Sequence, residues 1–285
     1  MAAMPNALFR NVYSAISDLP TLHVMTLTLP IAILLVVSGL IVGFINTLSA
    51  GGTAISISLY LTLGLPVDVV NATNRVGVLI QSISSAITYH SKKVLDYKKA
   101  LLLAIPTTIG AFGGANMAVQ VTETVIRYTL LGVLLMMTIF LFYNPKKLET
   151  DSAGHTRGLT AKEIIVYLLI GFYGGFIQVG TGFFLIMAGV SCVGYNLVRT
   201  NASKVLIVLI YTVVSIMVFA QKGIIRWDYG LLHGIGCVAG SVTGTLLGVK
   251  KGSGFVKWIS VGVIVLTILI LFNIIDLKHL LAFML

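Results

Sequence analysis

Two basic residues lie inside apolar segments, and their types and positions favour the binding of an anion. Arg75 follows the motif Asn71-Ala72-Thr73-Asn74, and Lys204 follows Asn201-Ala202-Ser203. A charged side chain within a membrane segment is costly and usually faces a cavity or a polar partner. The alternative is that the side chain extends to the membrane surface, which Lys204 could manage. The sequence therefore predicts that Arg75 and Lys204 neutralise a bound anion.

Further polar residues accompany the two basic residues at spacings of three and four, which is the spacing of one helix face. They fall on residues 69–90 and on residues 200–220. The members are Asn71, Asn74, Arg75, Gln81, Ser82, Ser85, Thr88 and Tyr89 in the first set, and Asn201, Lys204, Tyr211, Thr212 and Ser215 in the second. We expect both faces to border a cavity or a partner helix, with Asn71, Asn74 and Asn201 donating hydrogen bonds to the substrate.

Glycine-containing breaks interrupt two other apolar segments. They read Ser49-Ala50-Gly51-Gly52-Thr53 and Gly180-Thr181-Gly182, and a new helix is expected after each. The first amide groups of a helix lack internal partners and lie at the positive end of its dipole, so they favour an anion. We call these two breaks the first tip and the second tip. The candidate binding residues at the tips are Gly51, Gly52, Thr53 and Thr181, with Asn46 and Gln178 as nearby donors. The alternative is a pair of plain kinks.

Acidic residues are absent from the middle of the apolar segments. All nine lie in loops, in the polar lead or near expected helix ends. We therefore expect no metal site and no carboxylate proton relay, which argues against a cation carrier. His90 or His233 could titrate if protons are coupled to transport. The chain also has no HExxH or GxSxG motif, so we expect no catalytic residues, no cofactor and no enzyme activity.

The composition is that of an integral membrane protein. Hydrophobic residues make up 57% of the 285 residues and charged residues only 10%, whereas soluble domains carry about a quarter charged residues. The mean hydropathy is +1.01. The net charge of +10 comes largely from short lysine clusters between apolar segments, which is typical of loops that set membrane orientation. We expect an all-α polytopic protein whose partners are the lipid bilayer and a small anion, with no nucleic acid bound. The glycine-faced helices are also compatible with a homodimer.

The two halves of the chain match each other at a shift of 130 residues, as in Asn71/Asn201, Gly110/Gly240 and Gly114/Gly244. Matched halves with polar motifs at the same depth are common in secondary transporters. The glycines near residues 110 and 240 indicate close helix packing. The predicted organisation is a polar lead (1–21), a first repeat (22–143), a solvated linker (144–163) and a second repeat (164–285).

Each repeat is expected to contain a broken-helix hairpin and three further helices. The expected segments are 22–48, 54–63, 69–90, 99–119 and 124–143, then 164–179, 183–193, 200–220, 229–249 and 255–275. The second segment of each repeat is too short to span a bilayer, so each broken pair should enter the membrane and turn back. One hairpin plus three spans would invert the second repeat, whereas a fully spanning first helix would give parallel repeats. The distribution of Lys and Arg residues between the two membrane faces hardly distinguishes inverted from parallel repeats. We favour inverted repeats because the two tips would then meet.

The motifs resemble those of the TauE/SafE family, also called sulfite exporters, over about residues 30–275. The resemblance lies in Gly43-Phe44-x(6)-Gly51-Gly52, Gly64-Leu65-Pro66, Asn71-Ala72-Thr73-Asn74 and Thr200-Asn201-Ala202-Ser203-Lys204. It implies export of small sulfur oxyanions or organosulfonates, such as sulfite or sulfoacetate, across the bacterial inner membrane.

Together, these observations predict a multi-pass secondary transporter that exports a small anion by alternating access. The expected substrate-binding residues are Asn46, Gly51, Gly52, Thr53, Asn71, Asn74, Arg75, Gln178, Thr181, Asn201 and Lys204. Replacing Arg75 by Gln should abolish transport and leave folding intact. The alternatives are an anion channel and a membrane partner or assembly subunit that transports nothing.

Overall fold

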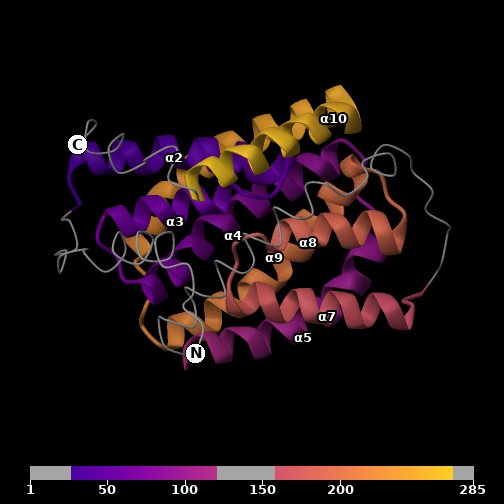
Figure 1. Cartoon of the computed structure of the whole chain (residues 1–285), viewed down its shortest axis with the longest axis horizontal. Helices are drawn as coiled ribbons and strands as arrows, with labels where there is room; N and C mark the ends of the chain where they lie inside the picture. The colour runs from indigo at the N-terminus through magenta and orange to yellow at the C-terminus, as the bar shows by residue number, and fades with distance from the viewer. Residues whose placement is uncertain (1–26, 121–157, 272–285) are drawn as a thin grey trace, which may run out of the picture.

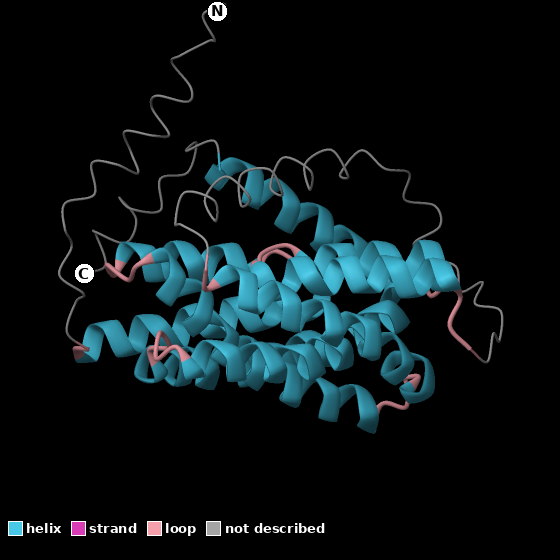
Figure 2. Ribbon diagram, turned by 90° about the horizontal axis from the view of Figure 1, so that it is seen from below, coloured by secondary structure: helices cyan, strands magenta, loops and turns pink. Residues whose placement is uncertain are grey.

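The computed structural model describes residues 27–120 and 158–271, and side chains as far as residue 263. Every regular element in these ranges is helical, which confirms the all-α prediction (Figures 1 and 2). The first half contains α2 (Leu29–Leu48), α3 (Gly52–Thr62), α4 (Val67–Ser91) and α5 (Tyr97–Ala118). The second half contains α7 (Ala161–Phe176), α8 (Thr181–Ala188), the π-helical turn η2 (Gly189–Val193), α9 (Leu197–Gln221) and α10 (Trp227–Leu271). The expected helix at 124–143 lies outside the described residues.

Polar caps explain where several helices begin. The Asp96 and Asn196 side chains accept hydrogen bonds from the backbone N–H groups of the third residues of α5 and α9, respectively. Thr160 and Glu163 form a reciprocal capping box at the start of α7. α7 therefore begins at Ala161, within the segment 144–163 that was expected to be a linker. The Thr-x-x-Glu spacing in the sequence indicates this helix start.

The C-terminal part contains the predicted break between the helices expected at 229–249 and 255–275. α10 consists of two helices that meet at a kink at Gly252, whose φ is 76° and ψ is −173°. Glycine can adopt this positive φ without a steric cost, so the break between the two helices is one residue long and shorter than the expected loop.

Glycines allow α10 to pack against α2. A methyl group on Gly236 would overlap the carbonyl of Val36, and one on Gly240 would overlap the carbonyl of Leu40. The predicted role of these glycines in close helix packing is confirmed. The residue numbers of the partners rise together, so α2 and the first part of α10 run in the same direction, as they do along the upper edge of Figure 1.

The same packing recurs between α5 and α7. A methyl group on Gly110 would overlap the Leu168 carbonyl, and one on Gly114 would overlap the Phe172 carbonyl. Here too the numbers rise together, so α5 and α7 run in the same direction. They lie side by side along the lower edge of Figure 1, with α4 and α9 between the two pairs.

The direction of α4 relates the two pairs of helices. Gly230 contacts Val76 and Gly234 contacts Ile80, so α4 runs in the same direction as α10 and α2. Residues 92–96 then reverse the chain into α5. α2 therefore runs in the opposite direction to α7, its counterpart in the second half.

Four helices in the described part of the chain are long and apolar enough to cross a membrane: Leu29–Leu48, Tyr97–Ala118, Leu197–Gln221 and Trp227–Val263. Large apolar side chains such as Ile105 and Ile109 stand exposed on their outer faces. α4 is long as well, but its polar residues are buried inside the bundle. A polar helix surrounded by apolar helices is the arrangement expected when polar groups face an internal site.

Candidate functional site

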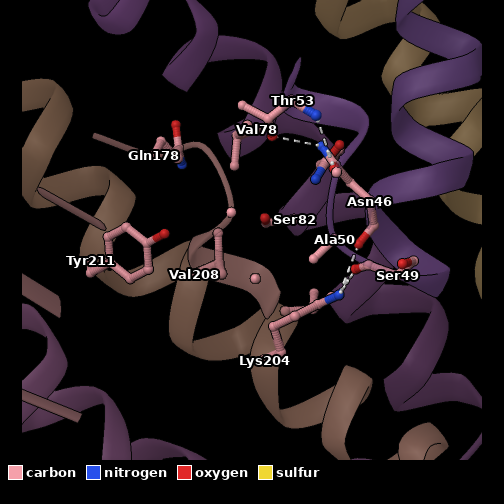
Figure 3. A pocket seen from close by; sticks show the side chains of 15 residues that line it. Asn46, Ser49, Ala50, Thr53, Val78, Ser82, Gln178, Lys204, Val208 and Tyr211 are labelled. Atoms are coloured by element: carbon pink, nitrogen blue, oxygen red, sulfur yellow. Dashed lines mark hydrogen bonds between the residues drawn. The ribbon is translucent and has the colours of Figure 1, made fainter. Parts of the chain in front are cut away.

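The two glycine-containing breaks meet at one pocket, against the middle of α4 and α9 (Figure 3). The cavity inside the pocket has a volume of about 40 Å³. The first tip contributes Asn46, Ser49, Ala50, Gly51 and Thr53, and the second contributes Gln178, Gly180 and Gly182; α4 contributes Val78, Gln81 and Ser82, and α9 contributes Lys204, Val205, Val208 and Tyr211. Both halves of the chain therefore build the same pocket.

Among the described residues that line the pocket, Lys204 is the only charged one. Its side chain is 4% exposed and extends toward the first tip (Figure 3). The Lys204 Nζ donates hydrogen bonds to the carbonyl oxygens of Asn46, at 2.8 Å, and Ser49, at 2.5 Å. These carbonyls lie at the C-terminal end of α2, where the helix dipole is negative. The ammonium group thus stabilises the broken end of α2 and borders the pocket.

Asn46 closes the first tip on itself. Its Nδ2 donates to Thr53 Oγ1 at 3.2 Å, and its Oδ1 accepts from the Thr53 backbone N–H at 3.2 Å. The side chain therefore joins the end of α2 to the start of α3. This bond supplies the N-terminal cap that Gly51, which has no side chain, cannot provide.

Gln178 attaches the second tip to both central helices. Its Oε1 accepts from Asn74 Nδ2 at 3.4 Å, and its Nε2 donates to Thr212 Oγ1 at 3.3 Å. The next turn requires Gly180, whose φ of 75° lies in the left-handed region. The second tip is therefore held between α4 and α9.

Arg75 lies outside the pocket wall and binds the broken end of α7. Its Nη1 donates to the Gly174 carbonyl at 3.0 Å, and its Nη2 donates to the Gly175 carbonyl at 2.7 Å. The guanidinium carbon lies 4.7 Å from the centre of the Phe219 ring. Arg75 is fully buried and contacts α7 as Lys204 contacts α2.

Two asparagines complete this reciprocal arrangement. Asn71 Nδ2 donates to the Phe176 carbonyl at 2.9 Å, and Asn201 Nδ2 donates to the Leu48 carbonyl at 2.8 Å. Each half thus provides an asparagine and a basic residue that bind the exposed carbonyls at the end of the other half's broken helix. We call these two sets the reciprocal caps: Asn71 with Arg75, and Asn201 with Lys204.

Comparison with protein families identifies the chain. The family described as Sulfite exporter TauE/SafE matches residues 35–271, which is most of the sequence.

The chain belongs to the TauE/SafE family.

Several relatives of this TauE/SafE protein are named as transporters. The probable membrane transporter protein ORF9 of a Sinorhizobium species is 28% identical over 223 residues, covering 78% of this chain and 85% of the relative. The probable membrane transporter protein YfcA of Escherichia coli strain K12 is 26% identical over 218 residues, covering 76% and 81%. A probable membrane transporter protein of Haemophilus influenzae is 22% identical over 219 residues, covering 77% and 86%. No solved structure matches the chain at a significant level. Family membership places the chain among membrane transporters.

The structure brings some of the predicted site residues of this TauE/SafE protein into the pocket wall and leaves others outside. Those in the wall are Asn46, Gly51, Thr53, Gln178 and Lys204. Gly52 begins α3 directly behind the tip and lies against Asn46. The remaining five predicted residues, Asn71, Asn74, Arg75, Thr181 and Asn201, hydrogen-bond to the protein around the pocket. They support the tips from behind.

Several wall residues were absent from the predicted set. Ser49 and Gly180 flank the predicted tip residues, while Gln81, Ser82 and Tyr211 lie on the polar helix faces. The repeat carries a signal for these last positions, because a shift of 130 pairs Gln81 with Tyr211 and Ser82 with Thr212. The apolar wall residues carry no such signal, since valine is common throughout membrane helices.

The chemistry of the wall suits an anion. Across residues 27–120 and 158–263, no group of three or more His, Cys, Asp or Glu residues is placed to hold a metal ion. The Ser49 Oγ is buried without a hydrogen-bond partner and is a potential donor. A cationic group, a free hydroxyl and two helix N-termini therefore meet in one enclosed space.

Proposed function

We propose that the pocket between the two tips is the substrate site of a secondary transporter that exports a small anion by alternating access. The observation that carries this proposal is the buried Lys204 ammonium, which is the only charged group among the described residues of a wall formed by both broken helices. A buried cation without a carboxylate partner favours a negatively charged ligand, because the ligand supplies the missing charge.

The hydrogen-bonding capacity of Lys204 supports direct contact with the substrate. An ammonium group has three N–H donors, and Lys204 directs two of them to the Asn46 and Ser49 carbonyls. The third remains available to an oxyanion. The Ser49 hydroxyl, which is buried without a partner, supplies a second donor beside it.

Sulfite or an organosulfonate such as sulfoacetate is the substrate that family membership favours. The family is described as a sulfite exporter family, whereas the names of the relatives specify no substrate. Sulfite and sulfonate groups present several oxygen acceptors, which match the donors of the wall. The bacterial relatives and the four apolar helices support a multi-pass location in a bacterial inner membrane.

The helix directions support inverted repeats and alternating access. α2 and α7 are counterparts that run in opposite directions, and their broken ends reach one pocket. The reciprocal caps connect each broken helix to a central helix of the other half. In inverted-repeat transporters, one repeat moves against the other around a central site, which exposes the site to each face in turn.

Counterflow in liposomes tests the proposal. Purified protein would be reconstituted with internal sulfite or sulfoacetate, and uptake of the labelled anion would be measured for wild type, Lys204→Gln and the exposed control Lys222→Gln on the same helix. We expect saturable uptake that internal substrate stimulates, with loss in Lys204→Gln and retention in Lys222→Gln. Conductance without saturation would identify an anion channel instead. Absence of flux for any anion would favour a partner or assembly subunit.

A further inference from the structure

Lys204 is the one basic side chain among the described residues that line the pocket. None of these lining residues is acidic. The four acidic residues whose side chains are described, Asp68, Asp96, Glu163 and Asp228, lie near helix ends away from the pocket. A ligand with one negative charge therefore makes the occupied site neutral.

Arg75, which is also buried, binds backbone carbonyls outside the pocket. Arg75 donates to the Gly174 and Gly175 carbonyls, approaches Asn71 Oδ1 at 3.5 Å and lies over the ring of Phe219. It forms no part of the pocket wall. Although Arg75 and Lys204 occupy nearly equivalent positions in the two repeats, only Lys204 lines the pocket.

The helix dipoles add little net charge. The N-termini of α3 and α8 bring partial positive charge to the tips, but the C-termini of α2 and α7 bring partial negative charge to the same places. Lys204 is itself bound to the carbonyls of α2. The helix ends at the tips can therefore orient a bound anion, but they add little net positive charge to the site.

One part of the wall is apolar. Val78 from α4 and Val208 from α9 point into the pocket (Figure 3). Ala50 and Val205 also line the pocket. These side chains offer no hydrogen bond to a charged oxygen. They offer dispersion contacts to a short hydrocarbon group instead.

We infer that the substrate is a small organic anion with a single negative charge and a short apolar group. The charged group binds at Lys204 and Ser49, and the apolar group lies against Val78 and Val208. A second charge on the same ligand would find no second basic side chain among the described residues of the wall, and a buried charge without a charged partner is strongly unfavourable. The inference rests on the proposed function and narrows it: among organosulfonates it favours simple monosulfonates over sulfoacetate, which also carries a carboxylate.

A matched pair of anions tests the inference. Ethanesulfonate and ethane-1,2-disulfonate share a two-carbon chain and differ in charge. Their binding to the purified full chain would be measured by calorimetry at constant ionic strength, with acetate and malonate as a second pair. We expect each monoanion to bind at least about tenfold more tightly than its dianion, a difference of about 1.4 kcal/mol. Propanesulfonate should bind at least as tightly as methanesulfonate, because it covers more of the apolar wall.

Variants at Lys204 complete the test. Lys204→Arg keeps the charge and should retain the preference for the monoanion, whereas Lys204→Gln should lose binding of both members of each pair. Lys222→Gln, a change at the exposed end of α9, should match wild type. Equal or tighter binding of the dianions to wild type would overturn the inference and leave the anion site standing. Failure of every anion of either charge to bind wild type would overturn the proposed function, and the inference with it.

Discussion

At the scale of single residues, the buried side chains of Arg75 and Lys204 have different surroundings despite their nearly equivalent positions in the two repeats. Lys204 combines bonds to two carbonyls with a place in the pocket wall. Arg75 uses the fork geometry of its guanidinium to bind two consecutive carbonyls of α7 and stays outside the wall. We therefore assign substrate contact to Lys204 and support of the second tip to Arg75.

The contacts of Arg75 change the expected effect of replacing it. Arg75→Gln removes charge-assisted bonds to the Gly174 and Gly175 carbonyls, which are buried at the end of α7. We expect the free energy of unfolding to fall by about 2–4 kcal/mol, in addition to the loss of transport. Arg75→Lys should fall between Gln and wild type, because it keeps the charge but loses the fork.

Thermal unfolding of the purified variants in detergent measures this effect. A variant Arg75→Gln with wild-type stability and no anion binding would contradict the supporting role. Such a result would indicate that the Arg75 guanidinium contacts the substrate directly.

The sequence predicted the residue types at the site better than their contacts. The repeat matches Asn71 to Asn201 and places the two basic residues one position out of register. That each pair binds carbonyls of the other half could not be predicted, because those bonds join residues about 100 to 150 positions apart. Local spacing carries no information about which helix end will lie opposite a side chain.

At the scale of elements, glycine faces set how closely the outer helices approach one another. α10 lies against α2, and α5 against α7, at distances where a methyl group would overlap a carbonyl. Without a strong hydrophobic driving force in lipid, close van der Waals packing of small residues is the main source of helix association. The glycine spacing in the sequence was sufficient to predict this packing, but it did not identify the partner helices.

A methyl group at Gly240 tests this packing. Gly240→Ala places a carbon against the Leu40 carbonyl and should reduce the free energy of unfolding by about 1–3 kcal/mol. Gly254→Ala, beyond the kink at Gly252, is the control, since no atom lies within 4 Å of the added carbon. The control should unfold at the wild-type temperature or slightly above it. Equal melting temperatures for the two variants would show that the α2–α10 contact is looser than described.

Helix boundaries were predictable where the signal is local and less so where packing decides. Gly51 and Gly180 mark both tips, and α2 ends at Leu48 as predicted. α7 ends at Phe176, three residues before the predicted end at 179, and α8 begins at Thr181, within the predicted break. The break expected between residues 249 and 255 is present as a kink at Gly252, which separates the two helices of α10. The start of α7 was placed three residues late, although Thr160 and Glu163 form a recognisable capping box.

At the scale of the whole molecule, the proposal depends on the orientation of the two halves in the membrane. Lys92 and Lys222 are exposed at equivalent positions, at the ends of α4 and α9. Inverted repeats place them on opposite faces of the membrane, whereas parallel repeats place them on the same face. The helix directions favour the first arrangement.

Cysteine labelling in intact cells distinguishes the two arrangements. Lys92→Cys and Lys222→Cys would be introduced separately into a Cys192→Ser background; the remaining Cys237 is buried. With a membrane-impermeant maleimide, we expect one variant to be labelled from outside and the other only after the cells are opened. Labelling of both from the same side would contradict inverted repeats.

The central claim is that Lys204 and the two tips form an anion site, and ligand-induced stabilisation tests it most directly. Melting temperatures of wild type, Lys204→Gln and Lys222→Gln would be measured with increasing sulfite, sulfoacetate, ethanesulfonate and acetate at constant ionic strength. An anion that binds the folded state increases the free energy of unfolding by mass action, by about 2.7 kcal/mol at a hundredfold excess over Kd, and therefore raises the melting temperature. We predict a saturable rise for at least one anion in wild type and Lys222→Gln, and none in Lys204→Gln. An equal rise in all three proteins, or no rise with any anion, would contradict the claim.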